Sequence, residues 1–214
     1  AYIHTFTYCK DAAAPKAYLN FEGVDSCFYV WLNGTYVGYS QVSHSTSEFD
    51  VTDLLIDGTN KLSVLVLKWC DGTYMEDQDK FRTSGIFRDV YLLKRPENSI
   101  VDYFVNTNLG ADIAEVSIRL TYRQNAIPVT ASIFAANGAL IATGNAHDLE
   151  GDEGYCQVIR MTIQNPTLWN AEAPYLYTLV LETENEVITD RLGVRKIEII
   201  NNVVYINGVA IKFR

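Results

Sequence analysis

The hydrophobic residues of this chain recur mostly at every second position, which is the period of a β-strand. Val116, Ile118 and Leu120 alternate with polar residues. This pattern predicts a strand with one buried face and one solvated face. Two further apolar rows have the same spacing, at 159–163 and 177–181.

One segment departs from this simple alternation. One face of the predicted strand carries Leu62, Val64 and Val66. The opposite face carries Leu65 and Leu67, which are also apolar. Both faces of a strand there would be largely apolar, so we expect this strand to lie between two covered surfaces.

Turns between the predicted strands are marked by Asn-Gly pairs. Asn33 and Gly34 separate the apolar stretches 28–32 and 35–37, and Asn207 and Gly208 separate 203–206 from 209–211. Asn-Gly tolerates the positive φ angles of a type I′ turn, so both pairs predict tight β-hairpins.

No segment carries a sustained helical stripe of apolar residues. Only 50–55 could form a short helical turn, with Asp50 or Thr52 as its cap. The chain is therefore predicted to be all-β, built of short strands that form sandwiches or barrels. A proline and polar residues near 95–99 indicate a boundary, and residues 99–193 have the length and strand spacing of an immunoglobulin-like sandwich.

Composition narrows the possible partners. Hydrophobic residues make up 48% of the 214 residues, and the formal net charge is −9. An acidic chain repels phosphates and anionic lipid, so we expect neither nucleic acid nor membrane as a partner, and the charge also serves solubility. No apolar run of about 18 residues and no signal peptide is seen. Since the chain opens inside a strand-like stretch without methionine, we expect it to be cut from a longer protein.

Four cysteines, at positions 9, 27, 70 and 156, lie far apart. They include no CxxC pair, so a zinc site has no support. Cys27 and Cys70 have apolar or aromatic neighbours, which favours small buried thiols. A reducing, cytoplasmic location is the simplest interpretation.

Charged side chains are most concentrated in residues 76–90. Glu76, Asp77 and Asp79 place three carboxylates within four residues, and Arg82 and Arg88 follow closely. Like charges this close require a partner that neutralises them. From the residues alone, the stretch is either a salt-bridged structural loop or a loop that binds a sugar or a cation.

Aromatic and histidine residues offer weaker candidates. Trp31, Trp69 and Trp169 could stack on sugar rings, but Trp31 and Trp69 lie in apolar stretches, so we expect core packing. The three histidines, His4, His44 and His147, are isolated in the sequence, and none is a credible catalytic base without a partner.

Several stretches together resemble the β-galactosidases of glycoside hydrolase family 2. They run in family order over nearly the whole chain: 21–26, 31–34, 37–40, 47–50, the WCDGTYM run at 69–75, the EDQD and SGIFRDV runs within 76–90, 165–177, and 192–208. The acidic EDQD form favours the galactosidase branch, because the related glucuronidases carry a less acidic segment there.

The resemblance implies a fold for each part of the chain. Residues 1–96 are expected to be a sugar-binding jelly-roll, truncated at its N-terminus and lacking early strands and an asparagine that touches substrate. Residues 97–193 are expected to be an immunoglobulin-like sandwich, and 194–214 the lead-in to an absent catalytic TIM barrel.

The resemblance also implies an activity for the parent protein. The parent would hydrolyse terminal β-D-galactose residues by a retaining mechanism, with two glutamates of the barrel as nucleophile and acid/base. Neither glutamate lies in this chain, so the piece by itself is expected to be inactive.

Site roles follow from the same resemblance. Asp79 matches the family aspartate that contacts the galactose 6-hydroxyl and ligates sodium in some members. Glu76, Asp77, Arg82 and Arg88 are expected to support the loop. We expect no cofactor in the fragment, sodium and magnesium in the full enzyme, a β-galactoside as its substrate, and a homo-oligomeric parent.

Two other functions stay open at this point. The chain could be a stand-alone carbohydrate-binding module, because jelly-rolls often serve that role, or a structural and assembly module. Sugar binding by the chain alone would indicate the first. The second predicts that Asp79→Ala leaves activity unchanged.

Overall fold

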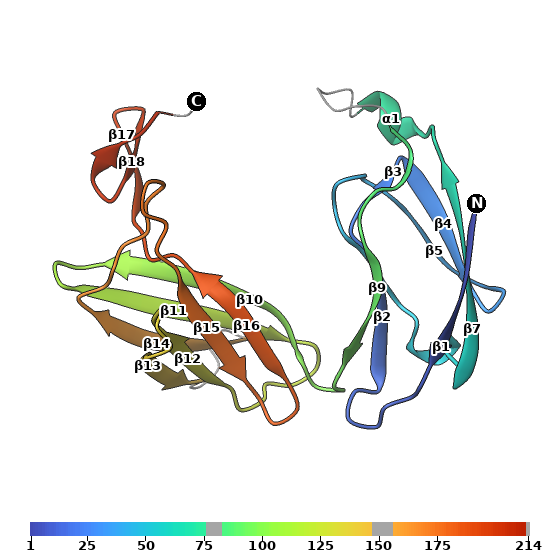
Figure 1. Cartoon of the computed structure of the whole chain (residues 1–214), viewed down its shortest axis with the longest axis horizontal. Helices are drawn as coiled ribbons and strands as arrows, with labels where there is room; N and C mark the ends of the chain where they lie inside the picture. Colours follow the sequence, from blue (N-terminus) through green and yellow to red (C-terminus); the bar gives the residue numbers. More distant parts are fainter. Residues whose placement is uncertain (76–82, 147–155, 213–214) are drawn as a thin grey trace. The chain divides into compact units, whose positions relative to one another are not determined.

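The computed structural model describes residues 1–75, 83–146 and 156–212. The chain forms two compact units, Ala1–Glu97 and Asn98–Arg214. All the sheets within the described residues are antiparallel, so the predicted all-β class is confirmed (Figure 1). Their helical elements are a 3-10 turn, η1 (Thr52–Leu54), and one short helix, α1 (Asp71–Met75). The sequence predicts η1 but not α1, and neither is long enough to cross a bilayer.

The first unit is a sandwich of two antiparallel sheets. The larger sheet has the spatial order β1 (Tyr2–Tyr8), β7 (Gly58–Leu67), β4 (Cys27–Leu32), β5 (Thr35–Gln41). The smaller sheet has the order β6 (Ser47–Asp50), β2 (Lys16–Phe21), β9 (Val90–Arg95), and a short pair joins β3 (Val24–Asp25) to β8 (Gly85–Ile86). The inward side chains of both sheets form one core, which includes Phe21, Phe28, Val30 and Leu32.

The first predicted hairpin is confirmed. Leu32 pairs with Thr35 across a two-residue turn in which Asn33 has φ 53° and Gly34 has φ 84°. These positive angles are those of a type I′ turn, whose twist matches that of the flanking strands β4 and β5.

Strand β7 differs from its prediction. Leu62 and Val64 face the core, but Leu65 and Leu67 are each 39% exposed. No second layer of described residues covers this side of the sheet, so the expectation that both faces are covered was wrong for this chain. Leu65 instead lies beside Tyr29 of the neighbouring strand β4, its register partner.

The described residues of the second unit form a sandwich of seven strands. One sheet has the order β10 (Ile100–Leu109), β11 (Ile113–Tyr122), β14 (Cys156–Gln164). The other has the order β13 (Leu140–Asn145), β12 (Thr130–Phe134), β15 (Tyr177–Glu182), β16 (Val187–Leu192). The alternating rows predicted from the sequence form its core: Val116, Ile118, Leu120, Ile159, Met161, Ile163, Tyr177, Leu179 and Leu181 are all buried.

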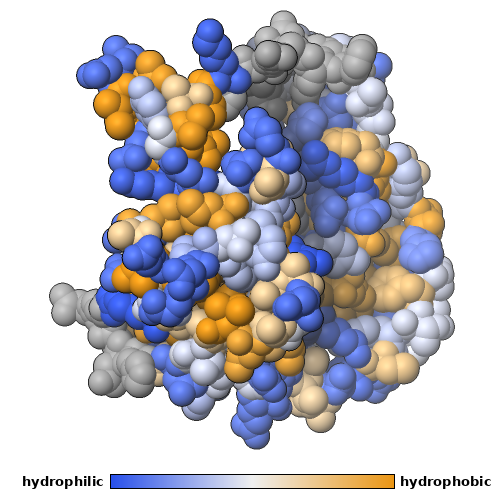
Figure 2. Space-filling model, turned by 60° about the vertical axis from the view of Figure 1, so that its left-hand side comes forward, coloured by the Kyte–Doolittle hydropathy of each residue, from blue (hydrophilic) through white to orange (hydrophobic). Residues whose placement is uncertain are grey.

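A small three-stranded sheet ends the described chain, with β17 (Ile197–Ile200), β18 (Val203–Ile206) and β19 (Val209–Ala210) in sequence order. The predicted Asn207–Gly208 turn joins β18 to β19 and has positive φ angles at both residues. The turn before it, where Asn201 and Asn202 also have positive φ angles, was not predicted from the sequence. Several side chains of this sheet are exposed and apolar, and Figure 2 shows hydrophobic surface gathered over it.

Candidate functional site

The acidic loop identified from the sequence falls largely outside the described residues. Glu76, Asp77, Asp79 and Arg82 lie within 76–82, so their predicted roles stay predictions. The segments on either side are described, and they show how the loop is attached to the first unit.

On the N-terminal side, α1 is fixed to the end of β7 by a threonine. Thr73 is buried, and its hydroxyl accepts a hydrogen bond from the Cys70 amide at 3.1 Å, while its own amide donates to the Cys70 carbonyl at 3.2 Å. These two bonds close the first turn of α1. The chain therefore leaves β7 through a fixed turn before the acidic stretch begins.

Aromatic side chains lie over this turn. The ring of Trp69 stacks on that of Tyr74 with centroids 6.3 Å apart, and the Lys68 ammonium lies 5.7 Å from the Trp69 ring. Trp69 is 54% exposed, so its predicted core packing was wrong. The reason is that β7 ends at Leu67 and the chain turns away before Trp69.

On the C-terminal side, β8 attaches the chain to β3. Gly85 pairs with Asp25 and Ile86 with Val24, and the Phe87 amide donates to the Gly23 carbonyl at 3.2 Å. Gly85 has φ 107°, a backbone angle that side chains other than glycine rarely adopt.

Arg88 is the one predicted loop-supporting residue within the described part of the chain. Its guanidinium lies 5.5 Å from the Phe87 ring and 3.4 Å from the His44 carbonyl oxygen, towards which it donates. It makes a longer contact of 3.5 Å with the Glu22 carbonyl. These contacts join two backbone segments beside β8, and its role in supporting the acidic loop stays a prediction.

A buried polar cluster beside β3 and the end of β7 was not predicted from the sequence. The Asp25 carboxylate is buried and accepts a hydrogen bond from the Ser43 hydroxyl at 2.8 Å. The Ser26 hydroxyl lies 2.7 Å from the Lys68 carbonyl and 3.0 Å from the same carboxylate oxygen. A single aspartate flanked by small polar residues gives no periodic signal, so only the folded structure identifies the cluster.

The aromatic residues of β4 and β5 form a continuous surface on the outer side of the larger sheet. The ring centroid of Tyr29 lies 4.8 Å from that of Tyr39 and 6.1 Å from that of Trp31, and Trp31 lies 5.8 Å from Tyr36. Trp31 is half-buried in this outer surface and does not enter the core. We call Tyr29, Trp31, Tyr36 and Tyr39 the aromatic face.

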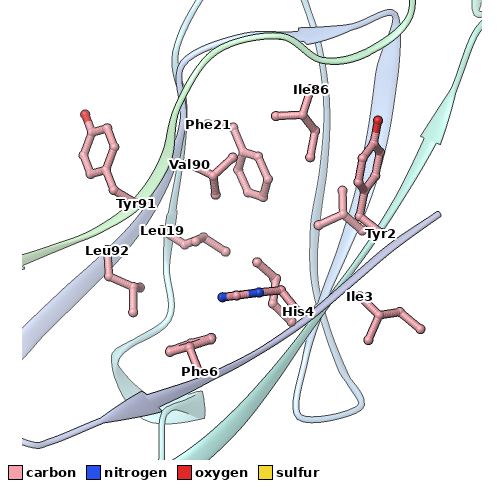
Figure 3. A pocket seen from close by; sticks show the side chains of 12 residues that line it. Tyr2, Ile3, His4, Phe6, Leu19, Phe21, Ile86, Val90, Tyr91 and Leu92 are labelled. Atoms are coloured by element: carbon pink, nitrogen blue, oxygen red, sulfur yellow. The ribbon is translucent and has the colours of Figure 1, made fainter.

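A cavity of about 470 Å³ lies in the first unit, lined in part by the edge strands β1 and β9. Its lining is mostly apolar, and Figure 3 shows His4, Phe6 and Phe21 turned towards it. A sugar site requires several converging polar groups, which this lining does not offer. The cavity is therefore better explained as incomplete packing between the two sheets.

The described residues give little support for a metal site or for a catalytic histidine. Over 1–75, 83–146 and 156–212, no cluster of three or more His, Cys, Asp or Glu side chains could hold a metal ion. His44 lies 5.3 Å from the Phe87 ring, and His4 is stacked beside Phe6. His147 lies outside the described residues.

The described residues thus form two consecutive β-sandwich units. Residues 1–96 match the family described as "Glycosyl hydrolases family 2, sugar binding domain", and residues 98–195 match "Glycosyl hydrolases family 2". The chain therefore belongs to glycosyl hydrolase family 2.

Among curated proteins, the chain is similar to two β-galactosidases. It is 46% identical over 218 residues to the β-galactosidase of Staphylococcus xylosus. This alignment covers 100% of this chain and 21% of the relative. It is also 46% identical over 198 residues to that of Actinobacillus pleuropneumoniae, covering 92% of this chain and 19% of that protein. The chain thus spans about a fifth of the length of these relatives.

Among solved structures, a β-glucuronidase of Bifidobacterium dentium complexed with coumarin-3-O-glucuronide superposes with a TM-score of 0.82 at 23% identity, covering 97% of this chain and 41% of that one. The β-glucuronidase of Ruminococcus gnavus gives 0.79 at 21% identity, covering 99% and 38%. At these identities the likeness establishes the fold.

Proposed function

We propose that this chain is the N-terminal, non-catalytic part of a β-galactosidase that removes terminal β-D-galactose by a retaining mechanism. The observation that carries this proposal is its alignment, from end to end, with proteins named β-galactosidase. The parent would hold its two catalytic glutamates in a barrel outside these residues, and the chain by itself would be inactive.

Within that enzyme, the chain would supply scaffold and one loop that flanks the substrate. The attachment of the loop on both sides supports this role. The hydrogen bonds of Thr73 fix its entry, and the pairing of β8 with β3 fixes its exit. Fixed flanking segments limit how far the intervening residues can reach.

Asp79 is the residue that we propose to contact substrate. Its carboxylate would accept a hydrogen bond from a galactose hydroxyl and serve as one oxygen ligand of a sodium ion, because hard cations prefer carboxylate oxygen. The described residues offer no metal cluster of their own, and we propose that the remaining ligands come from the barrel of the parent. We also propose that the parent uses magnesium, is located in the cytoplasm and forms a homo-oligomer. The same proposal divides this chain into a sugar-binding domain at 1–96, an immunoglobulin-like domain at 97–193 and a lead-in to the barrel at 194–214.

The test is a substitution in the complete protein. Asp79→Asn keeps the size of the side chain but removes its charge, and we expect kcat/KM for a nitrophenyl β-galactoside to fall by about 10²-fold or more. Asp77→Asn is the matched control, since it removes the same charge two residues away, and we expect a change of only a few-fold. Equal effects of the two substitutions would contradict the role of Asp79.

The aromatic face favours a second candidate, a carbohydrate-binding module. Tyr36 and Tyr39 are exposed beside Trp31 on a sheet surface, and flat aromatic rings can stack on sugar rings. This candidate requires saturable binding of a sugar by the chain alone, whereas the leading proposal does not.

A further inference from the structure

Two cysteines that lie 43 residues apart in the sequence meet in the folded first unit. Cys27 begins β4 and is buried, and Cys70 follows the end of β7 and is half-buried. Both are free thiols. Both were expected from the sequence to be small buried thiols, which is confirmed for Cys27, whereas Cys70 is only half-buried.

The strand register explains why they meet. Cys27 lies opposite Leu67 across β4 and β7 and opposite Gln41 across β4 and β5. The Ser26 amide donates to the Leu67 carbonyl at 3.2 Å, which holds the end of β7 beside the start of β4. Cys70 stands three residues beyond this point, in the turn that leads into α1.

Contacts around the turn place the Cys70 side chain near that of Gln41, the register partner of Cys27. The Cys70 sulfur lies 3.6 Å from the Thr73 hydroxyl oxygen. It also lies, with the Gln41 side chain, close to Gly72 of α1. Cys70 and Tyr39 are both among the groups that perturb the pKa of the Cys27 thiol, so these three side chains lie close together.

We propose that Cys27 and Cys70 form a dithiol site, which a peroxide oxidises to an intramolecular disulfide linking β4 to the residue before α1. Cys70 reacts first because it is the more accessible thiol. Its thiolate attacks one peroxide oxygen, the O–O bond breaks, and the products are a Cys70 sulfenic acid and water.

The second step closes the bridge. The Cys27 thiolate attacks the Cys70 sulfur, the S–S bond forms, and the departing hydroxide takes a proton to become water. In sum, two thiols and one hydrogen peroxide give one disulfide and two waters. Peroxide is the oxidant, and the cysteine sulfurs are oxidised.

The surroundings of Cys27 disfavour its thiolate form. Burial raises the pKa of the Cys27 thiol, whereas the neighbouring Tyr39 hydroxyl lowers that pKa. The other groups that face it are Cys70 and the Asp71 carboxylate of α1, which both raise the pKa. Burial and the contact with Cys27 also raise the pKa of the Tyr39 phenol, so this group stays a neutral hydrogen-bond partner.

The test uses the 214-residue chain with Cys9→Ser and Cys156→Ser, which leaves only the proposed pair. After treatment with a small excess of hydrogen peroxide, we expect both thiols to be lost together and the mass to fall by two hydrogen atoms. Proteolysis should then release a disulfide-linked peptide that contains positions 27 and 70. The wild-type chain, mapped in the same way, should give the same linked peptide.

A second probe examines proximity without oxidation. Phenylarsine oxide joins two neighbouring thiols through two S–As bonds with loss of one water, so the untreated pair should bind it in a one-to-one ratio. Adding Cys27→Ser or Cys70→Ser should abolish this binding and the linked peptide. Stable addition of oxygen to Cys70 alone, a disulfide between two chains, or no arsenical binding by the folded pair would each overturn the proposal.

Discussion

At the scale of single residues, the two predicted Asn-Gly turns do more than reverse the chain. The Asn33 side chain donates to the carbonyl of Leu54 and to the amide oxygen of Asn60, and it accepts from the Lys61 amide. Asn207 likewise accepts from the Lys196 amide and donates to the Trp169 carbonyl at 2.9 Å. Both asparagines therefore attach a hairpin to a third segment of the chain, which the turn propensity of Asn-Gly does not predict.

This double role gives a prediction for stability. Asn33→Ala removes three side-chain hydrogen bonds and places a Cβ-bearing residue at φ 53°, so we expect the free energy of unfolding to fall by about 2–4 kcal/mol. Urea unfolding followed by circular dichroism would measure it. Asn137→Ala is the control, because Asn137 accepts a single local bond from the Ala139 amide. Equal losses in the two variants would show that the long-range bonds of Asn33 contribute little.

At the scale of elements, strand β7 shows that a correctly identified periodicity can still lead to a wrong prediction of which strand faces are covered. Its apolar residues occupy both faces, as the sequence shows, but only the face with Leu62 and Val64 meets a second sheet. Leu65 instead borders the aromatic face, where Tyr29 of β4 lies opposite it. The pattern therefore identifies the apolar side chains on each face of the strand, and the fold determines what they contact.

The difference between the two faces can be measured with a matched pair of leucines. Leu32 is 1% exposed and Leu65 is 39% exposed. We expect Leu32→Ala to cost about 2–5 kcal/mol of unfolding free energy, because it opens a cavity in the core. Leu65→Ala should cost less than about 1 kcal/mol in this chain, since its side chain is partly hydrated already. Chemical denaturation of both variants would decide, and comparable losses would mean that the outer face is covered in solution.

At the scale of the whole molecule, the chain has the accessory folds of its family and spans about a fifth of its relatives. The described residues contain no metal-binding cluster, and the cavity between the two sheets of the first unit is mostly apolar. Under the proposal above, sugar recognition would depend on Asp79 together with groups of the parent outside this chain.

We therefore expect the isolated chain to be inactive. Incubation with a nitrophenyl β-galactoside should release no nitrophenol above the buffer rate, and calorimetry with galactose or lactose should show no saturable heat. Saturable binding at millimolar sugar would instead favour the carbohydrate-binding module. Loss of that binding in a Trp31→Ala variant would then assign it to the aromatic face.

The sequence by itself determined the all-β class, the alternating core rows, the Asn-Gly hairpins and the family, because each of these depends on local periodicity, turn chemistry or ordered motifs. It did not reveal the buried Asp25 cluster, the exposure of Trp69 or the pairing of Cys27 with Cys70. The Asp25 cluster and the proximity of the two cysteines depend on strand register, which brings together residues that are distant in the chain and leaves no mark on either local sequence. Trp69 is exposed because β7 ends before it and the chain turns away. The position of a side chain relative to its neighbours was therefore decided only when the sheets formed.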